Sequence, residues 1–145
     1  MTEDEKLIAE IRADEGVKPY AYQDHLGYWT IGIGRLIDKK KGGKLSDEEM
    51  DYLLGNDLDR FAAELDKHVP WWRKMAPVRQ RVLINLCFNM GWPKLSKFKN
   101  TLAAMERGDY KAAAKGMRDS LWFKQVQPSR SGRMVKQMET GNELA

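Results

Sequence analysis

Three polar side chains near the start of the chain have the chemistry of an acid, a base and a water-positioning hydroxyl. They are Glu15, Asp24 and Thr30, within the stretch EGVKPYAYQDHLGYWTIGIGR. Two carboxylates can protonate a leaving group and activate water, which is the usual way of hydrolysing a glycosidic bond. Because the chain has 21 acidic residues, the same positions also fit an ordinary surface glutamate, a turn aspartate and a strand threonine.

Glu15 is predicted to lie at the end of a helix. Thr2 and Glu5 have the spacing of a capping box, which marks a helix start, and Gly16 is a natural C-terminal stop. Three apolar side chains then share one helical face: Leu7, Ile8 and Ile11. The partial negative charge at a helix C-terminus disfavours an ionised carboxylate. We therefore expect Glu15 to be partly buried and to stay protonated, as a general acid must.

Asp24 and Thr30 are predicted to lie on a hairpin. Residues 20–24 fit a first strand, 25–27 a turn and 28–36 a second strand. Alternation places Tyr28 and Thr30 on one face together with two glycines, and it places three apolar residues on the other: Trp29, Ile31 and Ile33. We expect the apolar face to be buried and Thr30 to point into open space, where a ligand can approach the backbone.

The remaining segments predict a mostly helical α+β fold. Ser46 and Glu49 form a second capping box, and apolar residues follow at helical spacing until Pro70. Further helices are expected from Pro77 onward. The expected architecture is one domain over 1–145, with an active-site cleft between two lobes. Its parts are a small N-terminal β-sheet lobe at about 15–45 that ends in a polar turn at 39–44, a long connecting helix at about 46–67 and a helical lobe at about 69–145.

Composition narrows the classes of partner and cofactor. The net charge of +4 fits an anionic partner such as cell wall, nucleic acid or a membrane surface, and equally a slight lysine excess. The single cysteine, Cys87, lies in an apolar run and is expected to pack in the core. His25 and His68 are isolated, so neither a metal nor a cofactor is expected. The N-terminus lacks the pattern of a signal peptide, and no apolar run is long enough to span a membrane.

The three candidate residues belong to a longer series of motifs that runs along most of the chain. An Asp follows the Glu-Gly pair nine residues after the Glu, a Thr comes six residues later, and the run TIGIG begins there. Downstream, APVRQRVLINLCFNMGW, NTLAAMERGDYKAAAKGM and SLWFKQVQPSRSGR follow in order. Together these motifs resemble the phage-type lysozymes (endolysins), glycoside hydrolase family 24, up to about Gly141. The resemblance implies a muramidase with Glu15 as general acid, Asp24 as base or electrostatic stabiliser, Thr30 positioning water, and inversion at the anomeric carbon.

The resemblance also implies roles for residues outside the hairpin. Saccharide contacts fall by position on Leu36, Phe88, Thr101 and Gly116, although the two apolar residues fit the core equally well and Gly116 has no side chain. Arg130 and Arg133 fall near the cleft, and we expect one of them to pair with Glu15 or Asp14. Position 35 departs from the family, since Arg35 stands where the best-known relatives have histidine. We expect Arg35 to form an ion pair with Asp57.

Several readings of the function stay open. The resemblance implies a monomer without stable membrane insertion, which acts on bacterial peptidoglycan in the periplasm and is held in the host cytoplasm until a holin releases it. One alternative is a lytic transglycosylase that uses Glu15 alone, and another is a non-catalytic wall-binding protein. A nucleic-acid partner is not expected, since the lysines and arginines are scattered along the chain.

Overall fold

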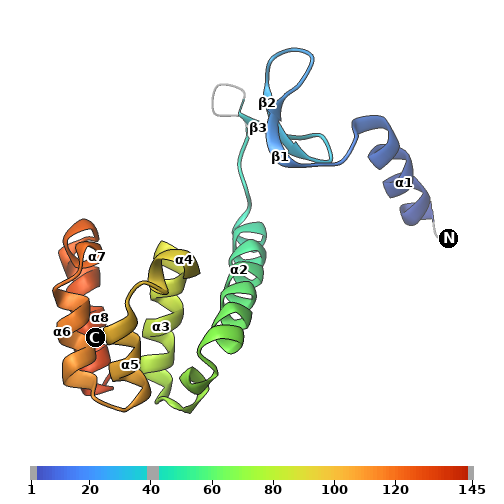
Figure 1. Cartoon of the computed structure of the whole chain (residues 1–145). Coiled ribbons are helices and arrows are strands. Elements are labelled where there is room, and N and C mark those ends of the chain that lie inside the picture. Colours follow the sequence, from blue (N-terminus) through green and yellow to red (C-terminus); the bar gives the residue numbers. More distant parts are fainter. Residues whose placement is uncertain (1–2, 39–42, 144–145) are drawn as a thin grey trace. The chain divides into compact units, whose positions relative to one another are not determined.

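The computed structural model describes residues 3–38 and 43–143 of the chain (Figure 1). Thr2 and most of the polar turn predicted at 39–44 lie outside the described residues. The chain divides into two compact units, Met1–Asp51 and Tyr52–Ala145. None of the helices in the described part is both long and apolar enough to cross a membrane.

The N-terminal unit consists of a helix and a small sheet. Its elements are α1 (Glu3–Glu15), β1 (Lys18–Gln23), β2 (Trp29–Gly32) and β3 (Arg35–Asp38). The strands form an antiparallel sheet in the order β1-β2-β3. Gly16 has a left-handed φ of +78°, and its N–H donates to the carbonyl of Arg12 at 3.0 Å. The predicted glycine stop is thus confirmed, and Glu15 is the last residue of the helix.

The single second strand expected over 28–36 is wrong. The chain turns at residues 33–34 and splits this segment into β2 and β3. Gly32 and Gly34, which flank Ile33, have φ angles of +71° and +66°. Glycine adopts such angles without steric cost, so the two glycines build a turn and not the bare face of a longer strand.

The faces of β2 are also the reverse of the expectation. Thr30 is only 4% exposed, whereas Trp29 is 48% and Ile31 37% exposed. Thr30 lies on the central strand, opposite Tyr22 on one side and Leu36 on the other. Side chains directly opposite one another share a face, so both neighbours flank the threonine. Burial here follows from the strand pairing and not from the apolar pattern.

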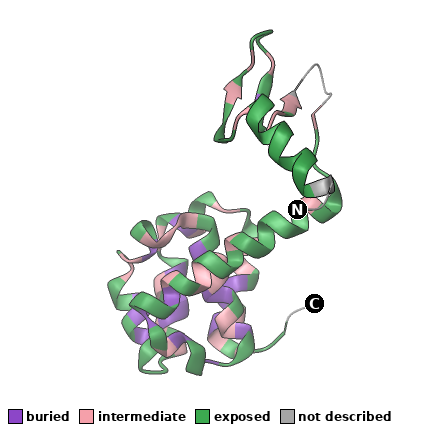
Figure 2. Cartoon of the chain, turned by 90° about the vertical axis from the view of Figure 1, so that its right-hand side faces the viewer, coloured by how far each residue is buried: buried purple, intermediate pink, exposed green. Residues whose placement is uncertain are grey.

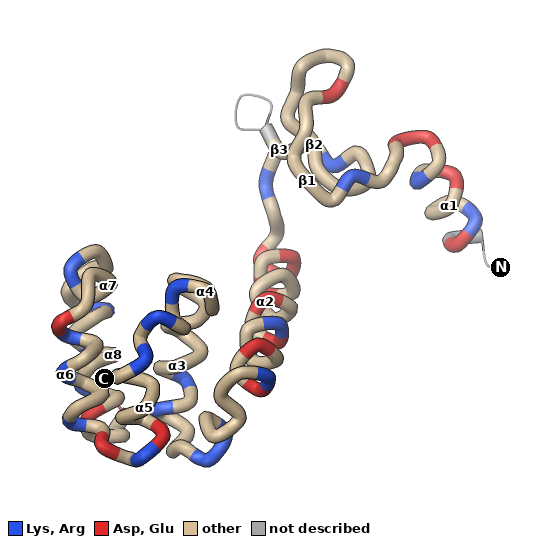
Figure 3. The backbone as a smooth tube through the Cα atoms, viewed as in Figure 1, with Lys and Arg blue, Asp and Glu red and all other residues tan. Residues whose placement is uncertain are grey.

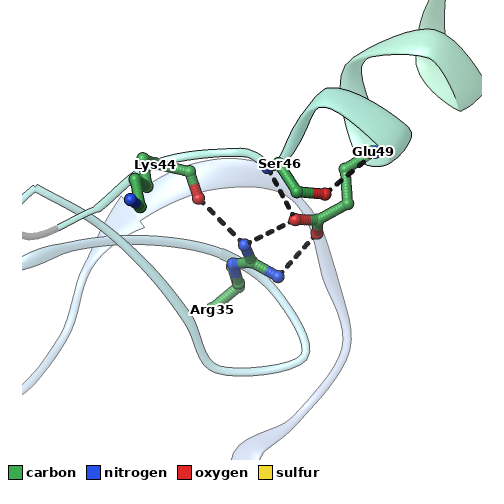
Figure 4. A network of polar contacts seen from close by, with 4 residues as sticks. All are labelled: Arg35, Lys44, Ser46 and Glu49. Atoms are coloured by element: carbon green, nitrogen blue, oxygen red, sulfur yellow. Dashed lines mark hydrogen bonds and ion pairs between the residues drawn. The ribbon is translucent and has the colours of Figure 1, made fainter.

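The long helix α2 (Asp47–His68) crosses the boundary between the units, and its range confirms a helix at the predicted position, 46–67. Its capping box is also confirmed. The backbone N–H of Glu49 donates to Ser46 Oγ at 3.1 Å, and the N–H of Ser46 donates to Glu49 Oε1 at 2.9 Å (Figure 4). Acidic residues occupy the first turn of the helix, where the tube is red in Figure 3, and two basic residues, Lys67 and His68, occupy the last turn. Both groups complement the helix dipole.

The helical unit contains the core of the protein. After α2 come η1 (Pro70–Lys74), α3 (Pro77–Met90), α4 (Trp92–Leu95), α5 (Lys99–Glu106), α6 (Tyr110–Arg118), α7 (Leu121–Gln125) and α8 (Pro128–Thr140). Buried residues gather in this unit (Figure 2). Cys87 is fully buried in α3, which confirms that it packs in the core. The sequence predicted the longer helices but missed the short η1, α4 and α7.

The guanidinium group of Arg79 contacts two other helices of the unit besides its own. The Arg79 guanidinium on α3 donates to the carbonyls of Met138 and Glu139 at 2.8 and 3.0 Å. It also lies 3.6 Å from the centroid of the Tyr110 ring at the start of α6. A positive charge at the last carbonyls of a helix complements the helix dipole, so Arg79 closes the C-terminal end of α8.

Candidate active site

Backbone groups of Tyr28 contact two of the three candidate residues. Asp24 Oδ1 accepts hydrogen bonds from the N–H groups of Leu26 and Tyr28, both at 2.9 Å, as in an Asx turn. The Tyr28 carbonyl in turn accepts from the Asp24 N–H at 2.8 Å and from the Thr30 hydroxyl at 3.2 Å. The side chains of Asp24 and Thr30 are therefore both held by backbone groups of Tyr28.

Glu15 lies against the other turn of the sheet. A Cβ built on Gly34 would fall 2.7 Å from Glu15 Oε2, so the carboxylate rests directly on the glycine backbone. The side chain of Glu15 is exposed, and the expected partial burial is wrong. Among the described side chains of α1, residues 5–15, none is buried. The helix therefore does not shield the side chain of its last residue, Glu15, from solvent.

The two carboxylates are thus placed by turns at opposite ends of β2. Asp24 belongs to the β1–β2 turn, and Glu15 contacts the β2–β3 turn. The four residues of β2 span roughly 10 Å, since a strand rises about 3.3 Å per residue. An acid and a base at the two ends of one strand can approach a ligand from different sides.

Arg35 pairs with Glu49 inside the N-terminal unit, and its expected pair with Asp57 of the other unit stays a prediction. The guanidinium donates to both carboxylate oxygens of Glu49, at 2.7 and 2.9 Å, and to the Lys44 carbonyl at 2.9 Å (Figure 4). Asp57 also lies 2.9 Å from Arg60, one turn along α2. The capping box already fixes the Glu49 carboxylate, so it offers the arginine fork a rigid partner.

The same contacts lower the pKa of the Glu49 carboxyl group. Hydrogen bonds from the Ser46 backbone and then from Arg35 lower the pKa of Glu49 from 4.5 to about 2. Both donors stabilise the ionised carboxylate. Glu49 is therefore charged throughout the neutral range, and its ion pair with Arg35 holds the start of β3 to the start of α2.

The helical unit brings three further candidates to neighbouring hollows. Phe88 and Arg130 line a pocket of about 430 Å³, in which Arg130 donates to Asn85 Oδ1. Arg133 lines an adjoining hollow of about 290 Å³, and Arg81 and Asn85 line both. The pairing of Arg130 or Arg133 with Glu15 or Asp14 stays a prediction.

The last candidates are less accessible. Thr101 on α5 is only 7% exposed and packs on Gly116 of α6, where a built Cβ would fall 2.1 Å from the Thr101 Oγ1 atom. Gly116 thus allows the two helices to approach closely. Leu36 is half-buried and lines a hollow of about 230 Å³ beside Ile31 and Arg35.

Comparison with known proteins decides the family. The profile of the phage lysozyme family matches residues 12–139, which is most of the chain. The chain belongs to the phage lysozyme family. The resemblance seen in the sequence is thereby confirmed, and the mostly helical α+β fold agrees with it.

Three relatives match this chain over different shares of their own length. The chain is 33% identical to the pre-baseplate central spike protein Gp5 of Enterobacteria phage T4, over 91% of this chain and 27% of that protein. It is 29% identical to the probable T4-type lysozyme 1 of Dictyostelium discoideum, over 90% and 92%. It is 26% identical to the endolysin of Acyrthosiphon pisum secondary endosymbiont phage 1, over 76% and 73%. The chain therefore spans about a quarter of the spike protein and nearly all of the Dictyostelium lysozyme.

Sequence reasoning missed several residues that contact the candidate residues within each unit. Tyr28 acts through its backbone N–H and carbonyl groups, and the residue type gives no sign of such contacts. Gly34 was visible in the run GIG but was interpreted as a strand position. Glu49 was recognised only as a cap, although the same carboxylate also binds Arg35. Asn85, the partner of Arg130, carried no signal of its own.

Proposed function

We propose that the chain is a muramidase that hydrolyses the β-1,4 bond between N-acetylmuramic acid and N-acetylglucosamine in bacterial peptidoglycan. Membership of the phage lysozyme family supports a glycosidase. Relatives named T4-type lysozyme, endolysin and peptidoglycan hydrolase support the substrate. The observation that carries the proposal is the arrangement of Glu15 and Asp24 at the two turns that bound β2.

In the proposed mechanism Glu15 donates its proton to the glycosidic oxygen as the bond to the anomeric carbon breaks. Asp24 takes a proton from water as the water oxygen bonds to that carbon, so the products are two sugars with hydroxyl groups at the cleaved bond. The Thr30 hydroxyl has given its hydrogen to the Tyr28 carbonyl, so its lone pairs can accept a hydrogen from that water.

The spacing of the turns favours inversion. Inverting glycosidases separate their carboxyl groups by about 6.5–9.5 Å to leave room for water, whereas retaining enzymes hold them at about 5–5.5 Å. Two carboxylates anchored at opposite ends of a four-residue strand fit the wider separation. Water, and not the Asp24 carboxylate, is then the nucleophile.

The other candidates take supporting roles in this proposal. Leu36 and Phe88 contact the saccharide through apolar surface, and Phe88 is the more accessible of the two at 41% exposure. Thr101 and Gly116 complete the saccharide contacts, and Arg130 and Arg133 support the acid. In a phage the enzyme would wait for a holin before it reached the wall.

The test is digestion of purified peptidoglycan by the wild type, Glu15→Gln, Asp24→Asn and the control Glu10→Gln. Glu10 is another exposed glutamate of α1. Asparagine keeps the Oδ1 acceptor of the turn and removes only the charge. We expect muropeptides with reducing N-acetylmuramic acid ends from the wild type and the Glu10 variant, and almost none from the other two.

Mass spectrometry of the products separates the alternatives. Anhydro-muropeptides that disappear in Glu15→Gln but persist in Asp24→Asn would replace the proposal with a transglycosylase. Binding to peptidoglycan without cleavage by the wild type would leave a wall-binding protein. Reducing N-acetylglucosamine ends would move the cut to the other glycosidic bond.

A further inference from the structure

A second pocket with aromatic walls lies in the helical unit, and no step of the proposed mechanism uses it. It is a hollow of about 500 Å³ between the end of α2, η1, α4 and α5. Its aromatic walls come from His68, Trp71 and Trp92, and its polar rim from Ser96, Lys99 and Glu106. Small-molecule sites in proteins commonly measure about 300–1,000 Å³, so the hollow has the size of a ligand site.

The aromatic walls of this pocket are held in place. The rings of His68 and Trp92 are stacked, with centroids 4.7 Å apart and planes 8° apart. The next residue after Trp71 is fixed as well, since the Trp72 indole N–H donates to Asp66 Oδ1 at 2.8 Å. Arg73 binds the same carboxylate at 2.9 and 3.0 Å. Asp66 thus holds η1 to the end of α2 through these hydrogen bonds. A ligand therefore loses little binding free energy to the ordering of η1.

Trp71 provides a partly exposed aromatic surface. It is half-buried, and among the residues that the structure describes no ring stacks on it and its indole N–H makes no hydrogen bond. An indole offers a large apolar face at little conformational cost together with one polar donor. Such a group recognises a ligand that has both apolar faces and hydrogen-bonding edges.

The rim supplies both donors and acceptors. Lys99 is a donor with three protons and Glu106 an acceptor, both are exposed, and within the described part of the chain neither forms an ion pair. One positive and one negative charge select against a strongly charged ligand of either sign. A neutral ring with several hydroxyl and amide groups matches this mixture better than a lipid or a phosphate.

We propose that this pocket is a second saccharide site, which binds an N-acetylhexosamine ring of the peptidoglycan glycan strand against Trp71 and Trp92. The choice of this sugar rests on the proposed substrate. Stacking on the indole would hold the C–H face of the ring, while the rim would bind its hydroxyl and amide groups. A site of this kind keeps the enzyme on an insoluble wall between cuts and takes no part in bond cleavage.

The test follows the tryptophan indole N–H signals by NMR while a tetramer of N-acetylglucosamine is added. The Glu15→Gln protein is used so that the saccharide is not consumed. The chain has five tryptophans, and two of them are internal controls, since Trp72 and Trp122 are only 1% and 6% exposed. We expect saturable shifts at Trp71 and Trp92 with little change at the two buried indoles.

Variants then test the aromatic contact. Trp71→Ala should weaken the affinity about three- to tenfold, as expected for the loss of one aromatic contact. Leu121→Ala, which removes another exposed apolar side chain at 67% exposure, should leave the affinity unchanged. If Trp71→Ala does not fold, Lys99→Ala and Glu106→Ala probe the same site from its exposed rim.

The outcomes separate this proposal from the proposed catalysis. No saturable shift at either indole would overturn the second site, and so would shifts produced by a free stem peptide but not by the sugar. If Glu15→Gln still cleaved peptidoglycan, the catalytic proposal would fail, while the indole titration would still decide this one. A functioning second site also predicts that Trp71→Ala binds whole sacculi less well but cleaves short soluble glycans at the wild-type rate.

Discussion

Gly34→Ala should damage catalysis through a contact that is specific to Glu15. The added Cβ would fall 2.7 Å from Glu15 Oε2, 2.8 Å from Cδ and 2.9 Å from Cγ. Ordinary van der Waals contact begins at 3.4 Å, so the carboxylate must retreat by about 0.7 Å. The three nearest atoms all belong to Glu15, so neither Asp24 in the β1–β2 turn nor Thr30 on β2 is among them.

Gly32→Ala is the matched control. Gly32 and Gly34 have similar φ angles of +71° and +66°, so alanine at either position costs roughly 1–2 kcal/mol of backbone strain. A Cβ on Gly32, however, meets nothing within 4 Å. The two variants should therefore lose similar stability, and only one of them should displace the acid.

Initial rates on purified peptidoglycan and urea denaturation of both variants test this reasoning. A displacement of about 1 Å in a catalytic group can cost on the order of 100-fold in rate, so we expect Gly34→Ala to lose roughly 10- to 100-fold in kcat. Gly32→Ala should keep most of its activity once its folded fraction is taken into account. Equal activities in the two variants would refute the claim that the Gly34 backbone positions Glu15.

Three further predictions concern packing and titration. Gly116→Ala should destabilise the helical unit by about 1–2 kcal/mol in urea denaturation, because overpacking against Thr101 outweighs the better helix propensity of alanine, and Thr101→Ala in the same chain should recover part of this loss. The Glu49 carboxylate should stabilise the fold fully above pH 4.5 and lose this effect as the pH falls towards 2, because its pKa is lowered to about 2 by Ser46 and Arg35. Glu49→Gln should then flatten the dependence of the melting temperature on pH in this range, and an unchanged slope would count against the ion pair. Burial raises the pKa of the Cys87 thiol to about 11, so at pH 8 about one thiol in 1,000 should be ionised, and a disulfide reagent should label it only after unfolding.

The sequence alone determined the features that depend on neighbouring residues. Gly16 ends α1 because glycine takes a left-handed angle without steric cost, and Ser46 and Glu49 start α2 because their side chains reach the backbone three residues away. The family was also evident, since it is carried by residue types at fixed spacing. Burial of Cys87 followed from the apolar run around it.

Only the tertiary structure decided the features that depend on partners distant in sequence. Thr30 is buried because Tyr22 and Leu36 lie opposite it on both neighbouring strands, and alternation within one strand carries no information about those partners. Arg35 binds Glu49 because the fold brings one rigid, pre-oriented carboxylate to the start of β3, and composition cannot select it from 21 acidic residues. The support of Glu15 by Gly34 likewise arises because the turn between β2 and β3 returns the chain to the end of α1.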